Sequence, residues 1–267
     1  MDAPIGIFDS GVGGLTVTRE IVRQLPYENL IYFGDTARVP YGTKSKDAVI
    51  RFSEQICRFL KTKNVKAIVI ACNTASALAL DVLQKEFDVP ILGVVEPGAL
   101  TANMATRNNR IGVICTRATV KSRIYEQYLH ELDPDNVVFT KACPLFVPLV
   151  EEGMIEDRVT DDMIRRYLSE FHQYEIDTIV LGCTHYPLLY SPIKRFVGQH
   201  VKLVNPAFET AKSLKSLLEE HDMLRKSKEA PRYEYYASDI NDSFVSFANN
   251  VLSHHVKEVQ NIDIEKY

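Results

Sequence analysis

The chain has 267 residues, enough for one large domain or two small ones. Its formal net charge is −4 and it has no basic stripe, so the sequence gives no support for nucleic-acid binding. The apolar runs last about five to eight residues, well short of the roughly 20 that a membrane helix needs.

The N-terminus passes at once into a strand-like run, so we expect no signal peptide. The five cysteines are an odd number in a long chain, which favours reduced thiols in the cytoplasm over a disulfide framework. None of them falls in a CxxC pair or in a cysteine and histidine cluster with zinc spacing. We therefore expect no structural metal.

The first part of the chain alternates strand-like and helix-like segments. The apolar patterns predict strands at 5–10, 30–35, 66–72 and 90–95, and helices at 15–25, 45–63 and 74–87. Ser45 is the expected N-cap of the second helix. Residues 96–98, Glu-Pro-Gly, predict a turn.

Three glycines, at positions 11, 13 and 14, separate the first strand from the first helix. They indicate either a tight turn or a loop whose backbone N–H groups a ligand approaches closely. The run is not a GxGxxG motif and the chain has no Walker A pattern, so nucleotide binding has little support.

The pattern then restarts near residue 110. Four strand-like segments repeat earlier ones about 110 residues later, which indicates a duplicated unit. We therefore predict an α/β fold of two similar lobes, each a mainly parallel sheet flanked by helices and related by internal pseudo-symmetry. The first lobe is placed at 1–97 and the second at 98–206. The remaining residues, 207–267, are expected to complete the first lobe.

Two matched stretches, 66–76 and 177–187, stand out in this pattern. In each, a β-branched run ends on a cysteine, Cys72 or Cys183, just before a helix-like segment. Ligands of parallel sheets bind at that end of the strands. Two thiols facing each other across a cleft between lobes suit removal of a proton from one face of a carbon and its return on the other.

Thiols suit this task because their pKa of about 8.5 can be brought toward neutrality, and a following helix N-terminus favours the thiolate. Asp9 and His185 lie close enough in the pattern to position a thiol or move protons to it. A purely structural role for these cysteines stays open, because free cysteines usually pack as small hydrophobic residues. It is the expected one for the other cysteines, namely Cys57, Cys115 and Cys143.

The acidic and histidine candidates also have structural alternatives. Asp9 is either a site residue or a helix cap. His185 is either catalytic or a structural histidine whose hydrogen bonds are made within the protein. Asp35 and Glu151 are either site residues or surface carboxylates.

Five motifs resemble those of the glutamate racemases, a family of cofactor-independent enzymes that make D-glutamate for bacterial peptidoglycan. The resemblance covers nearly the whole chain. The motifs are GIFDSGVGG at 6–14, GDTARVPYG at 34–42, ACNTAS at 71–76, ACPLFVPLVE at 142–151 and GCTHYP at 182–187.

This resemblance implies that Cys72 and Cys183 are the two acid/base residues, with Cys72 acting on D-glutamate and Cys183 on L-glutamate. Asp9, Glu151 and His185 would support them. The implied substrate-binding residues are Asp9, Ser10, Tyr41, Gly42, Asn73, Thr74, Thr116, Thr119, Thr184 and His185. The segment 115–119 departs from the usual form, with a cysteine and an arginine where small or acidic residues are expected.

The resemblance further implies a cytoplasmic homodimer that needs no pyridoxal phosphate, metal or nucleotide. Rival hypotheses are an aspartate racemase or another two-cysteine isomerase, a thiol redox or acyl-transfer enzyme, and a catalytically silent binding protein for an acidic metabolite. A two-base racemase incorporates solvent deuterium at the α-carbon, whereas a redox protein or a binder does not.

Overall fold

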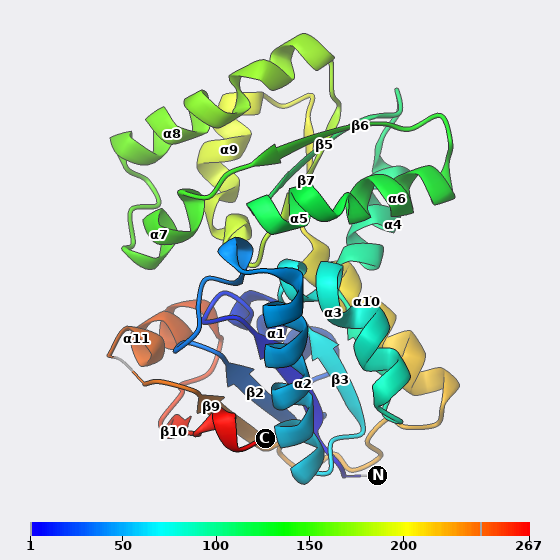
Figure 1. Cartoon of the computed structure of the whole chain (residues 1–267), viewed down its shortest axis with the longest axis vertical. Helices are drawn as coiled ribbons and strands as arrows, with labels where there is room; N and C mark the ends of the chain where they lie inside the picture. Colours follow the sequence, from blue (N-terminus) through cyan, green and yellow to red (C-terminus); the bar gives the residue numbers. More distant parts are fainter. Residues whose placement is uncertain (1, 241) are drawn as a thin grey trace.

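Two parallel sheets form the framework of the computed structural model, which describes residues 2–240 and 242–267 (Figure 1). The larger sheet has the strand order β10-β9-β2-β1-β3-β4. Its strands are β1 (Ile5–Asp9), β2 (Leu30–Gly34), β3 (Ala67–Ile70), β4 (Ile91–Gly93), β9 (Tyr233–Ala237) and β10 (Gln260–Asn261). Their apolar, β-branched residues are buried on both faces of the sheet, as is typical of parallel strands.

The smaller sheet repeats four of the six strands of the larger one, from β2 to the edge strand β4. Its order is β6-β5-β7-β8, which matches β2-β1-β3-β4 strand for strand, and all its pairs are parallel. Its strands are β5 (Arg110–Cys115), β6 (Val137–Ala142), β7 (Thr178–Gly182) and β8 (Lys202–Val204). The predicted α/β class and the internal duplication are therefore confirmed.

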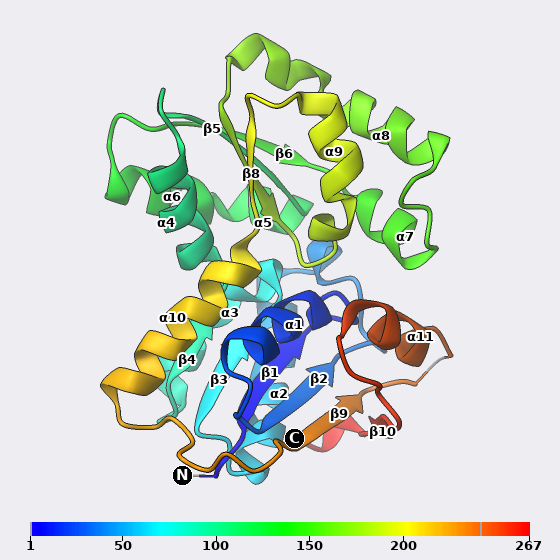
Figure 2. The ribbon, with the colours of Figure 1, turned by 180° about the vertical axis from the view of Figure 1, so that it is seen from behind.

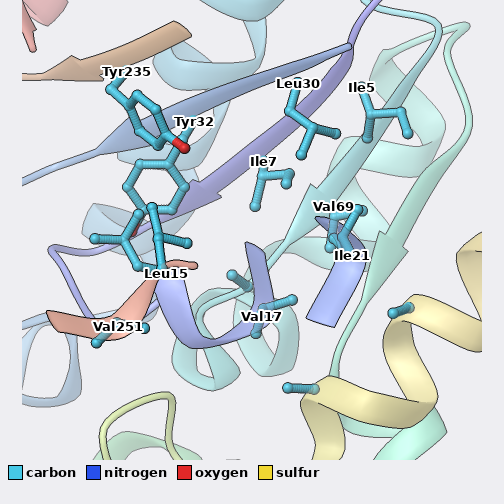
Figure 3. Close-up of a cluster of buried hydrophobic side chains, with 14 of the residues drawn as sticks. Ile5, Ile7, Leu15, Val17, Ile21, Leu30, Tyr32, Val69, Tyr235 and Val251 are labelled. Carbon is cyan, nitrogen blue, oxygen red and sulfur yellow. The ribbon is translucent and has the colours of Figure 1, made fainter. Parts of the chain in front are cut away.

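Helices cover both faces of the larger sheet. On one face, α1 (Leu15–Gln24), α10 (Pro206–Glu220) and α11 (Asp242–Val251) pack on the strands, and Figure 3 shows part of this core. On the other face lie α2 (Lys46–Thr62) and α3 (Asn73–Glu86). Ser45 caps α2 as predicted, since its hydroxyl accepts a hydrogen bond from the backbone N–H of Ala48.

The smaller sheet is covered in the same way. The helices α4 (Val95–Ala105) and α6 (Ile124–Leu132) pack on one face. The other face carries α7 (Phe146–Glu151), α8 (Arg158–Leu168) and α9 (Tyr190–Val197). The remaining helical segments are α5 (Arg117–Ser122), η1 (Tyr41–Thr43), η2 (Ser169–Tyr174), η3 (Tyr186–Leu189) and η4 (Ile264–Lys266).

The chain passes between the lobes at α4 and α10, which lie against each other (Figure 2). The predicted turn at 96–98 is wrong, because these residues form the first turn of α4. A proline is tolerated there, since N–H groups of a first turn have no partner within the helix. Gly98 allows close packing, because a Cβ at this position would lie 3.0 Å from a side-chain carbon of Pro206.

The last part of the chain extends the larger sheet. The strand β9 pairs in parallel with β2, and β10 pairs with β9. The helix α10 packs along α1 on the same lobe (Figure 2). Within the described residues, no helix combines the length and the apolar character needed to cross a membrane.

Candidate active site

A cavity of about 310 Å³ lies between the lobes, at the carboxyl ends of the strands of both sheets. The first lobe contributes the segments that follow β1, β2 and β3, and the second lobe those that follow β5, β6 and β7. The lining residues are Ser10, Val39, Pro40, Tyr41, Gly42, Thr43, Cys72, Asn73, Thr74, Thr116, Arg117, Pro144, Val147, Pro148, Glu151, Cys183, Thr184 and His185.

Cys72 caps the N-terminus of α3 inside this cavity. Its sulfur accepts a hydrogen bond from the backbone N–H of Ala75 at 3.5 Å and lies 3.7 Å from the hydroxyl oxygen of Ser10. Burial and the nearby negative charge of Asp9 nevertheless raise the pKa of this thiol to about 12. For Cys72, desolvation therefore outweighs the helix N-terminus that was expected to favour the thiolate.

Cys183 lies at the equivalent position after β7, but in different surroundings. Its sulfur is 3.9 Å from Nδ1 of His185. The helix expected directly after it is a 3₁₀ segment, η3, in which the N–H groups of Tyr186 and Leu188 donate to carbonyls three residues back. Pro187 between them has no N–H to donate. The α-helical backbone begins only at Tyr190, so an imidazole and not an α-helix N-terminus adjoins this thiol.

His185 links Cys183 to Glu151. Its Nε2 lies 2.9 Å from Oε1 of Glu151, and its ring is almost fully buried, with 3% of the side chain exposed. Burial lowers the pKa of His185, but the hydrogen bonds and the negative charges of Cys183 and Glu151 raise it more, to about 10. The imidazole is therefore protonated at neutral pH, and the two predicted supporting residues form one charged pair beside the thiol.

Asp9 lies behind the cavity and does not line it. Its Oδ2 accepts hydrogen bonds from the backbone N–H groups of Gly11 at 3.2 Å and Gly14 at 2.9 Å. Burial raises the pKa of this carboxyl, against the positive charge of His185 and the backbone donors. The glycine run is therefore a tight turn around a buried carboxylate, in which a Cβ on Gly14 would lie 2.5 Å from Cβ of Asp9.

Threonines join the two lobes at one side of the cavity. The hydroxyl oxygens of Thr74 and Thr116 are 2.9 Å apart, and a Cβ on Gly42 would lie 2.7 Å from Cβ of Thr116. The hydroxyl oxygen of Thr119 lies 3.0 Å from that of Thr116, and Thr119 does not line the cavity. The structure therefore brings Thr116 to the site and leaves Thr119 to hold it in place.

Asn73 is oriented by the second lobe. Its side-chain oxygen accepts a hydrogen bond of 2.6 Å from the buried hydroxyl of Tyr125. With its oxygen in this contact, the amide keeps its NH₂ group as a donor. A second hydrogen bond between the lobes involves Thr184, whose backbone oxygen accepts a hydrogen bond of 2.9 Å from the hydroxyl of Thr16.

Asp35 is fully buried, so the interpretation of it as a surface carboxylate is wrong. Its carboxylate accepts hydrogen bonds from the hydroxyls of Tyr41 and Ser238 and pairs with the guanidinium of Arg38 at 2.7 Å. Two of these partners follow it within one loop, whereas Ser238 comes from the far end of the chain. Asp35 thereby ties the loop that carries Tyr41 to the C-terminal segment.

Several lining residues were not among those predicted. Val39, Pro40, Pro144, Val147 and Pro148 give the cavity an apolar wall. They lie inside two of the motifs quoted above, and that position was the only signal for them. Arg117 is also new, and the irregular segment 115–119 was its signal.

Comparison with known proteins agrees with this geometry. The family model described as Asp/Glu/Hydantoin racemase matches residues 5–214. A glutamate racemase of Geobacter metallireducens is 47% identical over 261 residues, which are 98% of this chain and 97% of that protein. The chain belongs to the glutamate racemase family. Membership makes it an isomerase and a cofactor-independent racemase.

Solved structures of this racemase family share the fold. The glutamate racemase of Francisella tularensis, crystallised with D-glutamate, has a TM-score of 0.94 and 38% identity, covering 100% of this chain and 99% of that one. The glutamate racemase of Thermus thermophilus, crystallised with β-chloro-D-alanine, has a TM-score of 0.90 and 41% identity, covering 100% and 99%. The two-lobe architecture is thus that of the racemases.

In the part of the chain that the structure describes, no group of three or more His, Cys, Asp or Glu side chains is arranged to hold a metal ion. All five cysteines are free and buried.

Proposed function

We propose that the protein interconverts L- and D-glutamate by a two-base mechanism in which Cys72 and Cys183 are the acid/base residues. One observation carries this proposal. The two thiols line one cavity from equivalent positions, after β3 in one lobe and after β7 in its duplicate. A substrate between the lobes has one thiol on each side of its α-carbon.

In each turnover, one sulfur as thiolate takes the α-proton and the other thiol gives a proton to the opposite face. The two sulfurs end in exchanged protonation states, and proton exchange with water resets them. By resemblance to the family, Cys72 acts on D-glutamate and Cys183 on L-glutamate. The ammonium group of the bound substrate adds a positive charge near Cys72, which favours its thiolate.

The negative charge that develops at the α-carbon and carboxylate requires hydrogen-bond donors held in place. Ser10, Asn73, Thr74 and Thr184 supply hydroxyl and amide donors in the cavity. Asp9, Glu151 and His185 support the thiols, while Tyr41, Gly42, Thr116 and Thr119 bind or position the substrate. No pyridoxal phosphate, metal or nucleotide is required in this mechanism.

The finer assignments rest on the same family. Glutamate is favoured over aspartate because the relatives described above are glutamate racemases. The product D-glutamate serves peptidoglycan synthesis. The five free cysteines suit the cytoplasm. We also propose a homodimer, and a division of each chain into a lobe of 1–97 with 207–267 and a lobe of 98–206.

The test is to incubate the purified, chelator-dialysed protein with L-glutamate in D₂O and to follow optical rotation and the α-proton signal. We expect racemisation with deuterium at the α-carbon and little reaction with L-aspartate. Absence of racemisation, or a requirement for an added cofactor, would refute the proposal. Faster reaction of L-aspartate would assign the chain to the rival racemase activity.

A further inference from the structure

Arg117 is a cation on the cavity wall whose role the mechanism leaves open. It is the first residue of α5, directly after the cavity residue Thr116. Its side chain is exposed and lines the cavity. Within the described chain, its guanidinium has no hydrogen bond or ion pair with another residue. Structural ion pairing therefore does not account for it.

The charges along the cavity wall make Arg117 distinctive. Besides Arg117, the charged side chains of the lining are Glu151 and protonated His185, which lie 2.9 Å apart and offset each other. Arg117 thus carries a lining charge that has no hydrogen-bond or ion-pair partner among the described residues. Glutamate has two carboxylates and one ammonium group, and its net charge at neutral pH is negative. A positive charge at the cavity wall attracts such a substrate.

Arg117 is more exposed to solvent than the two thiols that are proposed to carry the reaction. The thiols of Cys72 and Cys183 are buried, whereas Arg117 is exposed to solvent. An exposed charge acts over a distance set by salt, about 10 Å at 0.1 M ionic strength. It acts mainly on the encounter with the substrate, because charges at the rim of a site change association rates more than the later steps.

We propose that Arg117 is a substrate-steering residue, which attracts the side-chain carboxylate of glutamate to the mouth of the cavity. This inference rests on the proposed function and adds a residue to it. It depends on the charge of Arg117 and not on the fork geometry of its guanidinium. A lysine at this position should therefore keep most of the effect, since it carries the same charge.

The chain offers a matched control in Lys121, which lies on the same short helix. It is also exposed and cationic, but it does not line the cavity. The experiment compares wild type with Arg117→Ala, Arg117→Lys, Arg117→Glu and Lys121→Ala. It measures kcat and KM for L- and D-glutamate at low salt and at about 0.5 M KCl, where the screening length falls to a few ångströms.

We expect Arg117→Ala to lower kcat/KM about fivefold at low salt, almost wholly through KM, and Arg117→Glu to lower it further. The difference from wild type should shrink at high salt. Arg117→Lys and Lys121→Ala should remain within about twofold of wild type, because each keeps a positive charge at position 117. Because the enantiomers have equal free energy, kcat/KM must fall equally in both directions, which checks each data set internally.

The outcomes distinguish this inference from the proposed function. A wild-type protein that does not racemise glutamate refutes the proposed function. An active wild type with equal effects of Arg117→Ala and Lys121→Ala refutes the steering role alone. A loss in kcat at constant KM, or a loss that persists at high salt, also refutes it, since either would place Arg117 in the chemical step or in direct binding.

Discussion

Replacement of Glu151 by glutamine removes the negative charge beside His185 while keeping the size of the side chain. In the wild type, Nε2 of His185 and Oε1 of Glu151 are 2.9 Å apart. Burial lowers the pKa of His185, and the contacts with Cys183 and Glu151 raise it to about 10. With glutamine, one of the two raising contacts loses its charge. We therefore expect the pKa of His185 to fall, while the histidine keeps its buried position in the site.

The size of the fall follows from the geometry. A hydrogen bond to a charged group contributes about 1.5–3 kcal/mol, and one pKa unit corresponds to about 1.4 kcal/mol. The side chain of Glu151 is 37% exposed, so water screens its charge and the lower end applies. Glu151→Gln should accordingly lower the pKa of His185 by about one unit.

The measurement is an NMR titration of the imidazole signals, with His185→Asn to identify one signal among the seven histidines. Glu152→Gln is the matched control, because Glu152 is the next residue and is exposed outside the cavity. An unchanged or higher pKa in Glu151→Gln, or an equal fall in the control, would refute the proposed pairing.

The same shift predicts how stability depends on pH. The pKa of folded His185 is raised above its ordinary value, so its charged form stabilises the fold fully below about pH 6.5. This stabilisation is lost as the pH rises through about 10. In Glu151→Gln the loss should occur at lower pH. Urea unfolding across this range measures it, and an identical pH dependence in both proteins would contradict the pairing.

Three further predictions concern the site. Cys72→Ser and Cys183→Ser should each abolish racemisation, because a hydroxyl is a far weaker acid than a thiol. Each variant should still eliminate a leaving group from a β-substituted glutamate, and the two variants should prefer opposite enantiomers of it. Racemisation by either variant would contradict the mechanism. Asp35→Asn should cost about 3 kcal/mol in urea unfolding and raise KM, because it leaves the partly buried guanidinium of Arg38 with only the exposed Glu265 as a carboxylate partner. Unchanged stability would contradict this. Thr116→Ala should raise KM more than Lys226→Ala does, and equal KM values would contradict a role in binding.

The local parts of the fold could be predicted from the sequence. The β-branched runs before Cys72 and Cys183 predicted buried strands, and the repetition of the strand pattern predicted a duplicated unit, which the two sheets show. These features depend on neighbours in the chain, which a single sequence displays. Ser45 could be predicted as an N-cap for the same reason, since its partner lies three residues away.

Features that depend on distant partners could not be predicted. The burial of Asp35 depends on Ser238, which is more than 200 residues away, and the helix at 96–98 depends on packing against Pro206. The charge balance around Arg117 likewise depends on a pair formed by residues of α7 and of the segment after β7. No local pattern in the sequence indicates such contacts, because neither partner differs from its sequence neighbours in a way that points to the other.

The unequal surroundings of the two thiols lead to a last prediction about their reactivity. Iodoacetamide attacks thiolates. Nδ1 of His185 lies 3.9 Å from the sulfur of Cys183, whereas burial and the negative charge of Asp9 raise the pKa of Cys72 to about 12. Access does not separate them, since Cys72 is 6% and Cys183 7% exposed.

In the substrate-free protein, Cys183 should therefore be alkylated before Cys72, as peptide mass spectrometry would measure. His185→Asn should slow the labelling of Cys183 and remove the preference. The internal controls are the three more deeply buried cysteines, which should stay unlabelled in the folded protein, namely Cys57, Cys115 and Cys143. Faster labelling of Cys72, or an unchanged preference in His185→Asn, would show that the imidazolium does not set the charge on the neighbouring sulfur.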